Sequence, residues 1–367
     1  MVSSFWPDFG NNGMAHATAS HLQMLSDLNC KVSVIAPEVN FPLVKKNFDL
    51  YKIRATGTGS IYSPSIVNTS KMFKILSMVK PELIIIEGWQ HALGHAAIRV
   101  GSKLGIKVLM VSHGISIHPY SFNIKNYFRY ICWLPFSIFS LKSLIRKIDI
   151  LIVLKKSKDS HRFYDYKIAL ENHVCIKEIP NAVKNNVTTI YGLNERKQNI
   201  IVIGYFSQIK NQLFALEVLK QLSHNIDLIF VGSKKGTYYN RCLNYVKRNN
   251  LSSNVKFFED SEFDIQKGLQ ECILLLNTSI TEVQPISIIE AISYGTPFIA
   301  KNNGVVKSIS GGIVIDDFNT NKFCSSIENL LSNKNIWNTL SAQGRKEFEE
   351  KYSYEKNIEI FSDAILT

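Results

Sequence analysis

Two glutamates, Glu282 and Glu290, flank a segment whose backbone could bind an anionic ligand. Pro285 lies between them and suits the first position of a helix, because the first N–H groups of a helix have no intrahelical acceptor. The N–H groups that follow would point toward the loop that holds Glu282; they belong to Ile286, Ser287 and Ile288. A helix N-terminus of this kind binds phosphate through its donors and its dipole. The segment therefore predicts a site for a phosphate-bearing ligand.

Glu290 is expected in the middle of the same helix, which ends before Gly295 and is otherwise apolar around the glutamate. A buried carboxylate is costly unless hydrogen-bond donors meet it, and the hydroxyl groups of a sugar are suitable donors. The simpler alternative is a capped amphipathic helix that tolerates one glutamate. The spacing of the two glutamates leaves both interpretations open.

These residues must be positioned by an α/β framework, because short apolar runs alternate with longer amphipathic stretches along the whole chain. Nearly continuous Val- and Ile-rich runs are typical of parallel strands that are buried on both faces. They predict strands at 31–36, 83–87, 107–112, 148–154, 199–204, 227–231, 255–258, 272–276 and 297–300, with helices at 15–28, 212–222, 238–248 and 285–294. Such a pattern predicts two doubly wound domains, with the polar segment 181–198 as the linker.

The glutamate pair, followed by Ala291 and by Gly295-Thr296-Pro297, resembles the E-x7-E motif of the retaining glycosyltransferases of family 4. Further pieces follow the family's order along nearly the whole chain: Gly10-Asn11-Asn12-Gly13, His113-Gly114, Ile179 to Val183, Gly204 to Asn211, Val231-Gly232-Ser233 and an aromatic helix near Tyr352–Phe361. The resemblance implies the GT-B fold, in which two Rossmann-like doubly wound domains face a central cleft. Residues 1–183 would form the N-terminal acceptor-binding domain, with a C-terminal helix at about 352–367 packing back on it. Residues 184–351 would form the C-terminal nucleotide-sugar-binding domain.

The resemblance also implies roles for individual residues. Glu282 would contact the donor sugar, Lys210 would neutralise the diphosphate leaving group, and His113 would hydrogen-bond the transferred sugar. Glu290 would hold the ribose hydroxyls. The remaining positions expected in the nucleotide site are Gly13, Gly204, Gly232, Ser233, Phe258, Glu259, Pro285, Ile286 and Ser287. Enzymes of this family need no divalent metal, so we expect neither a metal nor a cofactor, and the nucleotide-sugar is a substrate.

The sequence departs from the family's pattern at Tyr205, where an arginine is usual, so that Lys210 is left as the principal cation. Lys301, Lys234 or Lys235 could compensate for the missing arginine. The glycine-rich loop that follows Gly-Thr-Pro is reduced to Asn302-Asn303-Gly304. Gly10 and Gly13 have no third glycine at the spacing of a dinucleotide fingerprint, which argues against a dehydrogenase.

The positive charge is concentrated in the first half of the chain. Of the formal net charge of +12, residues 1–183 contribute +11, from 22 basic and 11 acidic side chains. Aromatic and basic residues alternate from 125 to 147, which is typical of a surface at a bilayer interface. The residues expected to face a membrane or acceptor there are Lys125, Arg129, Trp133, Lys142 and Arg146. An ordinary core helix with solvated lysines is the alternative, and no nucleic-acid-binding motif accompanies the charge.

Together these observations predict a retaining, hexosyltransferase-type enzyme that moves a sugar from a nucleotide-sugar, UDP-linked before GDP-linked. Its acceptor would be a lipid-linked or other glycan in the biosynthesis of a bacterial surface polysaccharide or glycoconjugate, such as lipopolysaccharide or capsule. The scattered cysteines and the absence of a long apolar run predict a cytoplasmic protein, peripheral at the inner face of the plasma membrane. The alternatives are a weak or inactive GT-B binding or scaffold protein, and an enzyme with a soluble small-molecule acceptor.

Overall fold

The computed structural model describes residues 1–4, 13–38, 48–61, 63–115, 124–157, 163–185, 187, 189–223 and 226–366, without the side chains of Lys125 and Asn126. The chain forms two compact units. Unit 1 comprises Met1–Asn181 together with Asn357–Thr367, and unit 2 comprises Ala182–Lys356. Each unit has its own core and is described by itself.

Unit 1 is built on a parallel sheet. Its strands are β1 (Ser33–Pro37), β2 (Asp49–Ile53), β5 (Leu83–Glu87), β6 (Lys107–Ser112), β7 (Ile150–Val153) and β8 (Cys175–Glu178). The order β5-β6-β7-β8 is joined to the β1-β2 pair by Val2, which bridges Ile35 and Ile86. A short antiparallel ribbon is formed by β3 (Ala55–Thr56) and β4 (Ile66–Val67). The predicted strands 83–87 and 107–112 match β5 and β6 residue for residue, whereas β2 and β8 were not predicted.

The helices of unit 1 include α1 (Gly13–Asp27), α2 (Thr69–Val79), α3 (Ala92–Lys103) and α6 (Tyr164–Glu171). The last helix, α13 (Tyr354–Leu366), belongs to unit 1 from Asn357 onward. The ring of Phe361 on α13 stacks on that of His21 on α1, with 5.0 Å between ring centroids. This contact ties residues at the two ends of the sequence into one core.

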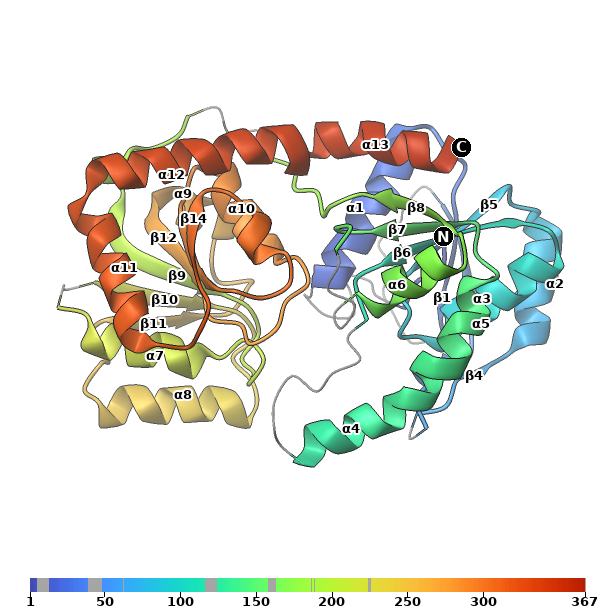
Figure 1. Cartoon of the computed structure of the whole chain (residues 1–367), viewed down its shortest axis with the longest axis horizontal. Helices are drawn as coiled ribbons and strands as arrows, with labels where there is room; N and C mark the ends of the chain where they lie inside the picture. The colour runs from blue at the N-terminus through green and yellow to red at the C-terminus, as the bar shows by residue number, and fades with distance from the viewer. Residues whose placement is uncertain are drawn as a thin grey trace. The chain divides into compact units, whose positions relative to one another are not determined.

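Unit 2 is an open parallel sheet with the strand order β11-β10-β9-β12-β13-β14. The strands are β9 (Lys197–Ile203), β10 (Asp227–Val231), β11 (Val255–Phe258), β12 (Cys272–Asn277), β13 (Phe298–Lys301) and β14 (Gly312–Ile315). Its helices are α7 (Gln212–Gln221), α8 (Thr237–Arg248), α9 (Ile265–Glu271), α10 (Ile286–Ser293), α11 (Thr320–Ser332) and α12 (Lys334–Glu347). Figure 1 shows α7 and α8 on one side of this sheet and α12 on the other. The strand order reverses between β9 and β12, and ligands of such sheets bind beyond the carboxyl ends at this switch point.

The segment predicted as a linker, 181–198, belongs to unit 2 from Ala182 onward. Arg196 is buried, and its guanidinium donates hydrogen bonds to the carbonyls of Cys272, at 2.8 Å, and of Tyr294, at 2.9 Å. Burial lowers the pKa of Arg196 to about 10. Carbonyls that lie inside the protein need donors, and the arginine supplies them from a stretch whose polar composition suggested a solvated linker.

A helical arm projects from the core of unit 1. It comprises α4 (Ile124–Pro135), a π-helical turn (Phe136–Ser140) and α5 (Leu141–Ile145). The buried Phe136 stacks on His95, with 5.0 Å between centroids, and so fixes the arm to α3. In Figure 1 the arm is a nearly continuous run of helix whose α4 end extends beyond the strands of unit 1. No helix among the described residues has both the length and the apolar character needed to cross a bilayer.

Candidate functional site

Lys210 and Glu282, two of the predicted catalytic residues, form an ion pair in unit 2. The Nζ of Lys210 lies 2.5 Å from Oε1 of Glu282, and the side chains are 22% and 14% exposed. Lys210 follows β9 and Glu282 follows β12, so the pair lies at the switch point of the sheet. Partial burial strengthens the attraction between the charges and leaves both accessible to a ligand.

The turn that carries Lys210 is shaped by Gly204 at the end of β9. Gly204 has φ +144°, and a Cβ at this position would lie 3.3 Å from both Cδ and Cε of Lys210. The buried side chain of Gln212 donates to the carbonyl of Gly204 at 3.1 Å, and the hydroxyl of Thr278 donates to that of Lys210 at 3.0 Å. The glycine therefore gives the lysine stem its space, and two side chains fix the backbone on either side.

Gly232 brings the end of β10 against the end of β9. Its φ is +156°, and a Cβ there would lie 2.3 Å from the carbonyl oxygen of Gly204, so a larger residue does not fit. Ser233 comes directly after it. The N–H of Gly232 donates to the carbonyl of Phe258 at 3.0 Å, which aligns the ends of three neighbouring strands.

The turn at Phe258 and Glu259, expected to present its backbone to the base, has partners within the protein. The carbonyl of Phe258 accepts the bond from Gly232, and the N–H of Glu259 donates to Glu262 at 2.9 Å. The carboxylate of Glu259 accepts a bond from the N–H of Lys234 at 2.8 Å. These bonds fix the turn. A carbonyl oxygen has two lone pairs, so that of Phe258 can still accept a hydrogen bond from a ligand.

The N-terminus of α10 differs by one residue from the expectation. Pro285 is the N-cap rather than the first helical residue, and its carbonyl accepts a bond from the N–H of Ile288 at 3.1 Å. Ile288 was expected to offer its N–H to a ligand; this is corrected, because the tight first turn uses that donor. The N–H groups of Ile286 and Ser287 precede the first intrahelical bonds. Gly295 follows the last turn at φ +62°, as predicted.

Glu290 lies on α10 in a desolvated position. Burial raises its pKa to about 7, and no hydrogen bond from the described residues counteracts this shift. Within that part of the chain, the carboxyl group has none of the donors that normally accompany a desolvated acid. Among the described residues, no group of three or more His, Cys, Asp and Glu side chains could hold a metal ion; whether the protein needs a metal stays a prediction.

The loop Asn302-Asn303-Gly304 supports the backbone of Glu282, a role that the sequence did not reveal. Gly304 has φ +52°, and a Cβ there would lie 2.2 Å from the carbonyl oxygen of Glu282. The side chain of Asn303 donates to the carbonyl of Ser279 at 2.6 Å, and the N–H of Val305 donates to that of Val283 at 2.9 Å. The shortened loop therefore still holds the segment that bears the glutamate.

Two of the three lysines considered as substitutes for the missing arginine have partners elsewhere, and the third, Lys235, is exposed. The Nζ of Lys234 lies 2.7 Å from Glu262, and that of Lys301 donates to the carbonyl of Asn302 at 2.8 Å. Tyr205, at the position of the usual arginine, is 45% exposed. Lys210 is thus the cation that the structure pairs with Glu282.

In unit 1, His113 contacts a glutamate that sequence reasoning missed. His113 follows β6 and Glu87 ends the adjacent β5; Nε2 of His113 lies 3.3 Å from Oε2 of Glu87. The other carboxylate oxygen lies 2.8 Å from Nδ1 of His21. Burial alone would raise the pKa of Glu87, but the charge and hydrogen bonds of the two histidines outweigh it and lower the pKa to about 2. The available signal was one acidic residue at the end of an otherwise apolar strand.

Gly13 is the first residue of α1, and Gly10 to Asn12 lie outside the described residues. On the arm, Arg129, Lys142 and Arg146 are exposed. Trp133, predicted to face a membrane, is half-buried instead, and its ring meets that of Phe136 edge-on at 5.1 Å. The indole packs inward because it fills the space beside the ring that anchors the arm. The side chain of Lys125 is not among those described.

Known proteins resemble this chain in sequence or in fold. Residues 183–347 match the family described as "Glycosyl transferases group 1". An uncharacterized glycosyltransferase of Methanocaldococcus jannaschii is 25% identical over 224 residues, which cover 56% of this chain and 62% of that protein, less than two thirds of its length.

Solved structures extend the likeness of fold to the whole chain. HepE of Anabaena, in complex with UDP and glucose, is 14% identical with a TM-score of 0.71, covering 100% of this chain and 98% of that one. The lipopolysaccharide outer core galactosyltransferase WaaB is also 14% identical, with a TM-score of 0.64, covering 100% and 98%. Residues 183–347 therefore match the glycosyl transferases group 1 family, and the chain as a whole has the GT-B fold.

Proposed function

We propose that the protein is a retaining glycosyltransferase that transfers a hexose-type sugar from a UDP-sugar to a membrane-associated glycan acceptor. The observation that carries the proposal is the Lys210–Glu282 pair, at the switch point of a group 1 domain. A cation beside the N-terminus of α10 suits a diphosphate, since both favour negative charge. The UDP bound to HepE, a protein of the same fold, favours a uridine nucleotide.

The donor would be held by groups whose chemistry matches its parts. Lys210 and the N–H groups of Ile286 and Ser287 would bind the diphosphate. Glu290, whose carboxyl group is desolvated and receives no hydrogen bond from the described residues, would accept hydrogen bonds from the ribose hydroxyls. Residues Gly204, Gly232, Ser233, Phe258 and Glu259 would bring the strand ends close to the nucleotide.

In the reaction, the bond between the anomeric carbon and the diphosphate breaks, and the acceptor oxygen bonds to the same carbon on the same face. The proton of the acceptor hydroxyl passes to a phosphate oxygen of the departing UDP. Lys210 stabilises the negative charge that develops on that phosphate. Glu282 and His113 would contact the transferred sugar, and we propose that no metal or cofactor takes part.

The acceptor side of the proposal is supported by charge. Residues 1–183 carry nearly all of the net positive charge, which favours an anionic partner such as a lipid-linked diphosphate glycan. We therefore propose a role in bacterial surface polysaccharide or lipopolysaccharide synthesis, peripheral at the cytoplasmic face of the membrane. The lipopolysaccharide galactosyltransferase of the same fold supports this context. The competing possibility is a soluble small-molecule acceptor.

Tyr205 supports a second candidate, a GT-B protein that binds nucleotide with little turnover. With tyrosine in place of the usual arginine, a single lysine paired to Glu282 must counter the leaving group. Nucleotide binding and sugar transfer must therefore be measured separately.

The decisive experiment combines calorimetric titration of UDP and GDP with a screen for hydrolysis of UDP- and GDP-sugars. The proposed enzyme binds UDP more tightly than GDP and hydrolyses at least one UDP-sugar slowly in the absence of acceptor. UDP binding without hydrolysis or transfer would favour the scaffold. Binding of neither nucleotide would refute both candidates.

A further inference from the structure

The helical arm exposes large apolar side chains. Ile124 is 88% exposed, Phe139 73% and Phe128 65%, and Ile131 and Ile138 are about half exposed. Isolated apolar residues are common on protein surfaces, but a contiguous apolar patch usually marks a site of interaction. The outer face of the arm is such a patch, although its inner face already packs on the core of unit 1.

Three of the exposed apolar residues share one face of α4. Ile124, Phe128 and Ile131 are spaced by four and three residues, which places them on a single stripe of α4. The π-helical turn then inserts one extra residue, and Ile138 and Phe139 are the exposed residues within it. Pro135, just before this turn, has no N–H to donate, which favours the change of helical pitch there.

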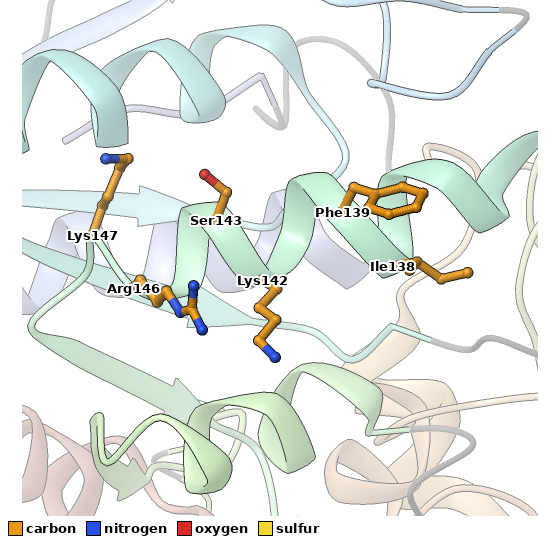
Figure 2. Close-up of a pocket in the computed structure, with 6 residues that line it drawn as sticks. All are labelled: Ile138, Phe139, Lys142, Ser143, Arg146 and Lys147. Carbon is orange, nitrogen blue, oxygen red and sulfur yellow. The ribbon is translucent and has the colours of Figure 1, made fainter.

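Beyond the apolar stripe, the arm ends in a basic groove. We define the basic groove by its lining residues: Ile138, Phe139, Lys142, Ser143, Arg146 and Lys147. They form two rows spaced by four residues, and in Figure 2 the row of Phe139, Ser143 and Lys147 points to the opposite edge of the helix from the row of Ile138, Lys142 and Arg146. The Nε of Arg146 donates to Asn172 at 2.9 Å, which orients its guanidinium.

The charge of the arm favours one of two possible partners for this surface, which are a lipid bilayer and a second copy of the chain. The stretch from 124 to 148 contains five basic residues and no acidic one, so the arm does not neutralise its own charge. Apolar side chains followed by lysine and arginine on one helical face fit the boundary between lipid headgroups and acyl chains. An interface between two copies of this face would oppose like charges, which disfavours self-association.

We propose that the arm docks unit 1 on an anionic lipid surface. Its apolar stripe enters the boundary region of the bilayer, and its basic groove binds the phosphate of a lipid headgroup. The inference deepens the proposed function, on which it rests for the membrane-borne acceptor. It assigns separate roles to two pairs of residues. Phe128 and Ile131 provide affinity for any bilayer, and Lys142 and Arg146 provide the preference for anionic lipid.

The test is co-sedimentation of the full chain with two kinds of vesicle, phosphatidylcholine alone and phosphatidylcholine mixed with phosphatidylglycerol. We expect tight binding to the mixed vesicles, weakening as salt is raised, and much weaker binding to the neutral ones. The double variant Lys142→Gln/Arg146→Gln should lose roughly thirtyfold on mixed vesicles and little on neutral ones, since each basic residue near an anionic leaflet contributes about fivefold.

Phe128→Ser/Ile131→Ser should weaken binding to both vesicles. Matched controls lie on α2 of the same unit: Lys71→Gln/Lys74→Gln for the charges and Phe73→Ser for the aromatic ring, all at exposed positions. Thermal melts show whether each variant is folded, and because the substituted side chains are exposed, the melting temperatures should stay close to wild type.

The inference is overturned if wild type binds neither vesicle, if both vesicles bind equally, or if the α2 controls lose as much as the arm variants. Concentration-dependent dimers that the arm variants abolish, without vesicle binding, would assign the face to a second copy instead. Hydrolysis of UDP-sugar by wild type without vesicles tests the proposed function separately. Vesicle binding with no turnover would therefore refute the enzyme and leave the docking surface standing.

Discussion

Two carboxylates that burial desolvates, the fully buried Glu87 in unit 1 and the half-buried Glu290 in unit 2, have opposite environments. Glu87 lies between His21 and His113, and its pKa is lowered to about 2. Glu290 receives no compensating hydrogen bond from the residues that the structure describes, and its pKa is raised to about 7. Both are desolvated by burial, so burial does not explain the difference. The partners do, because nearby positive charge and hydrogen bonds favour the ionised form.

The comparison separates a carboxylate that the chain satisfies from one that it leaves for a ligand. Glu87 belongs to the architecture of unit 1, where it holds two histidine rings and so positions His113. Glu290 stays costly to ionise until donors reach it, which makes it a candidate for ligand binding. Each prediction below tests one side of this contrast.

The largest expected effect is on the stability of unit 1. Glu87→Ala removes the carboxylate that two histidines contact, and leaving buried partners uncompensated typically costs about 3–5 kcal/mol in free energy of unfolding. Urea denaturation measures this loss. Glu82→Ala is the matched control, because Glu82 is exposed just before the same strand and should change the stability little. Equal stabilities of the two variants would contradict a structural role for Glu87.

The next effect is on turnover. Lys210→Ala removes the cation paired with Glu282, and loss of one group that stabilises developing charge typically lowers kcat about 10²–10³-fold. Initial-rate measurements with the donor identified by the hydrolysis screen give the ratio. Lys220→Ala, at an exposed position on α7, should retain wild-type turnover. A Lys210 variant with normal kcat would remove this lysine from the proposed site.

Glu290 should determine the affinity for nucleotide. Glu290→Gln keeps the shape of the side chain and loses the charged acceptor, so UDP should bind about tenfold more weakly or worse. The wild-type affinity should also fall by up to tenfold for each pH unit below 7, while the variant shows no such dependence. Titration calorimetry at several pH values measures both the loss of UDP affinity in the variant and the pH dependence of the affinity. An unchanged affinity at every pH would exclude Glu290 from the nucleotide site.

The sequence allowed prediction where the signal is local. The strand 83–87 is a single apolar run, and the segment from Glu282 to Gly295 carries its proline, glutamates and glycine within one loop and helix. The missed features depend on partners that are far apart in sequence. Glu87 meets His21 66 residues away, and Arg196 reaches the carbonyl of Tyr294 98 residues away. Composition cannot identify such pairs, because only the folded sheet brings them together.

The smallest effect provides the sharpest test, because the two carboxylates should respond to pH with opposite sign. Glu290 binds its proton in the folded state up to pH 7 but in the unfolded chain only up to its ordinary 4.5, so its contribution to stability rises as pH falls from 7 to 4.5. Glu87 titrates near 2 when folded, so its contribution is complete above 4.5 and is lost between 4.5 and 2. The unfolding free energies of wild type, Glu290→Gln and Glu87→Gln are measured at a series of pH values. Subtracting the value of each variant from that of wild type isolates the contribution of the substituted carboxylate. The slopes should be at most about 1.4 kcal/mol per pH unit, in separate windows. Slopes in the same window would mean that burial alone governs both carboxylates and that the histidines do not distinguish them.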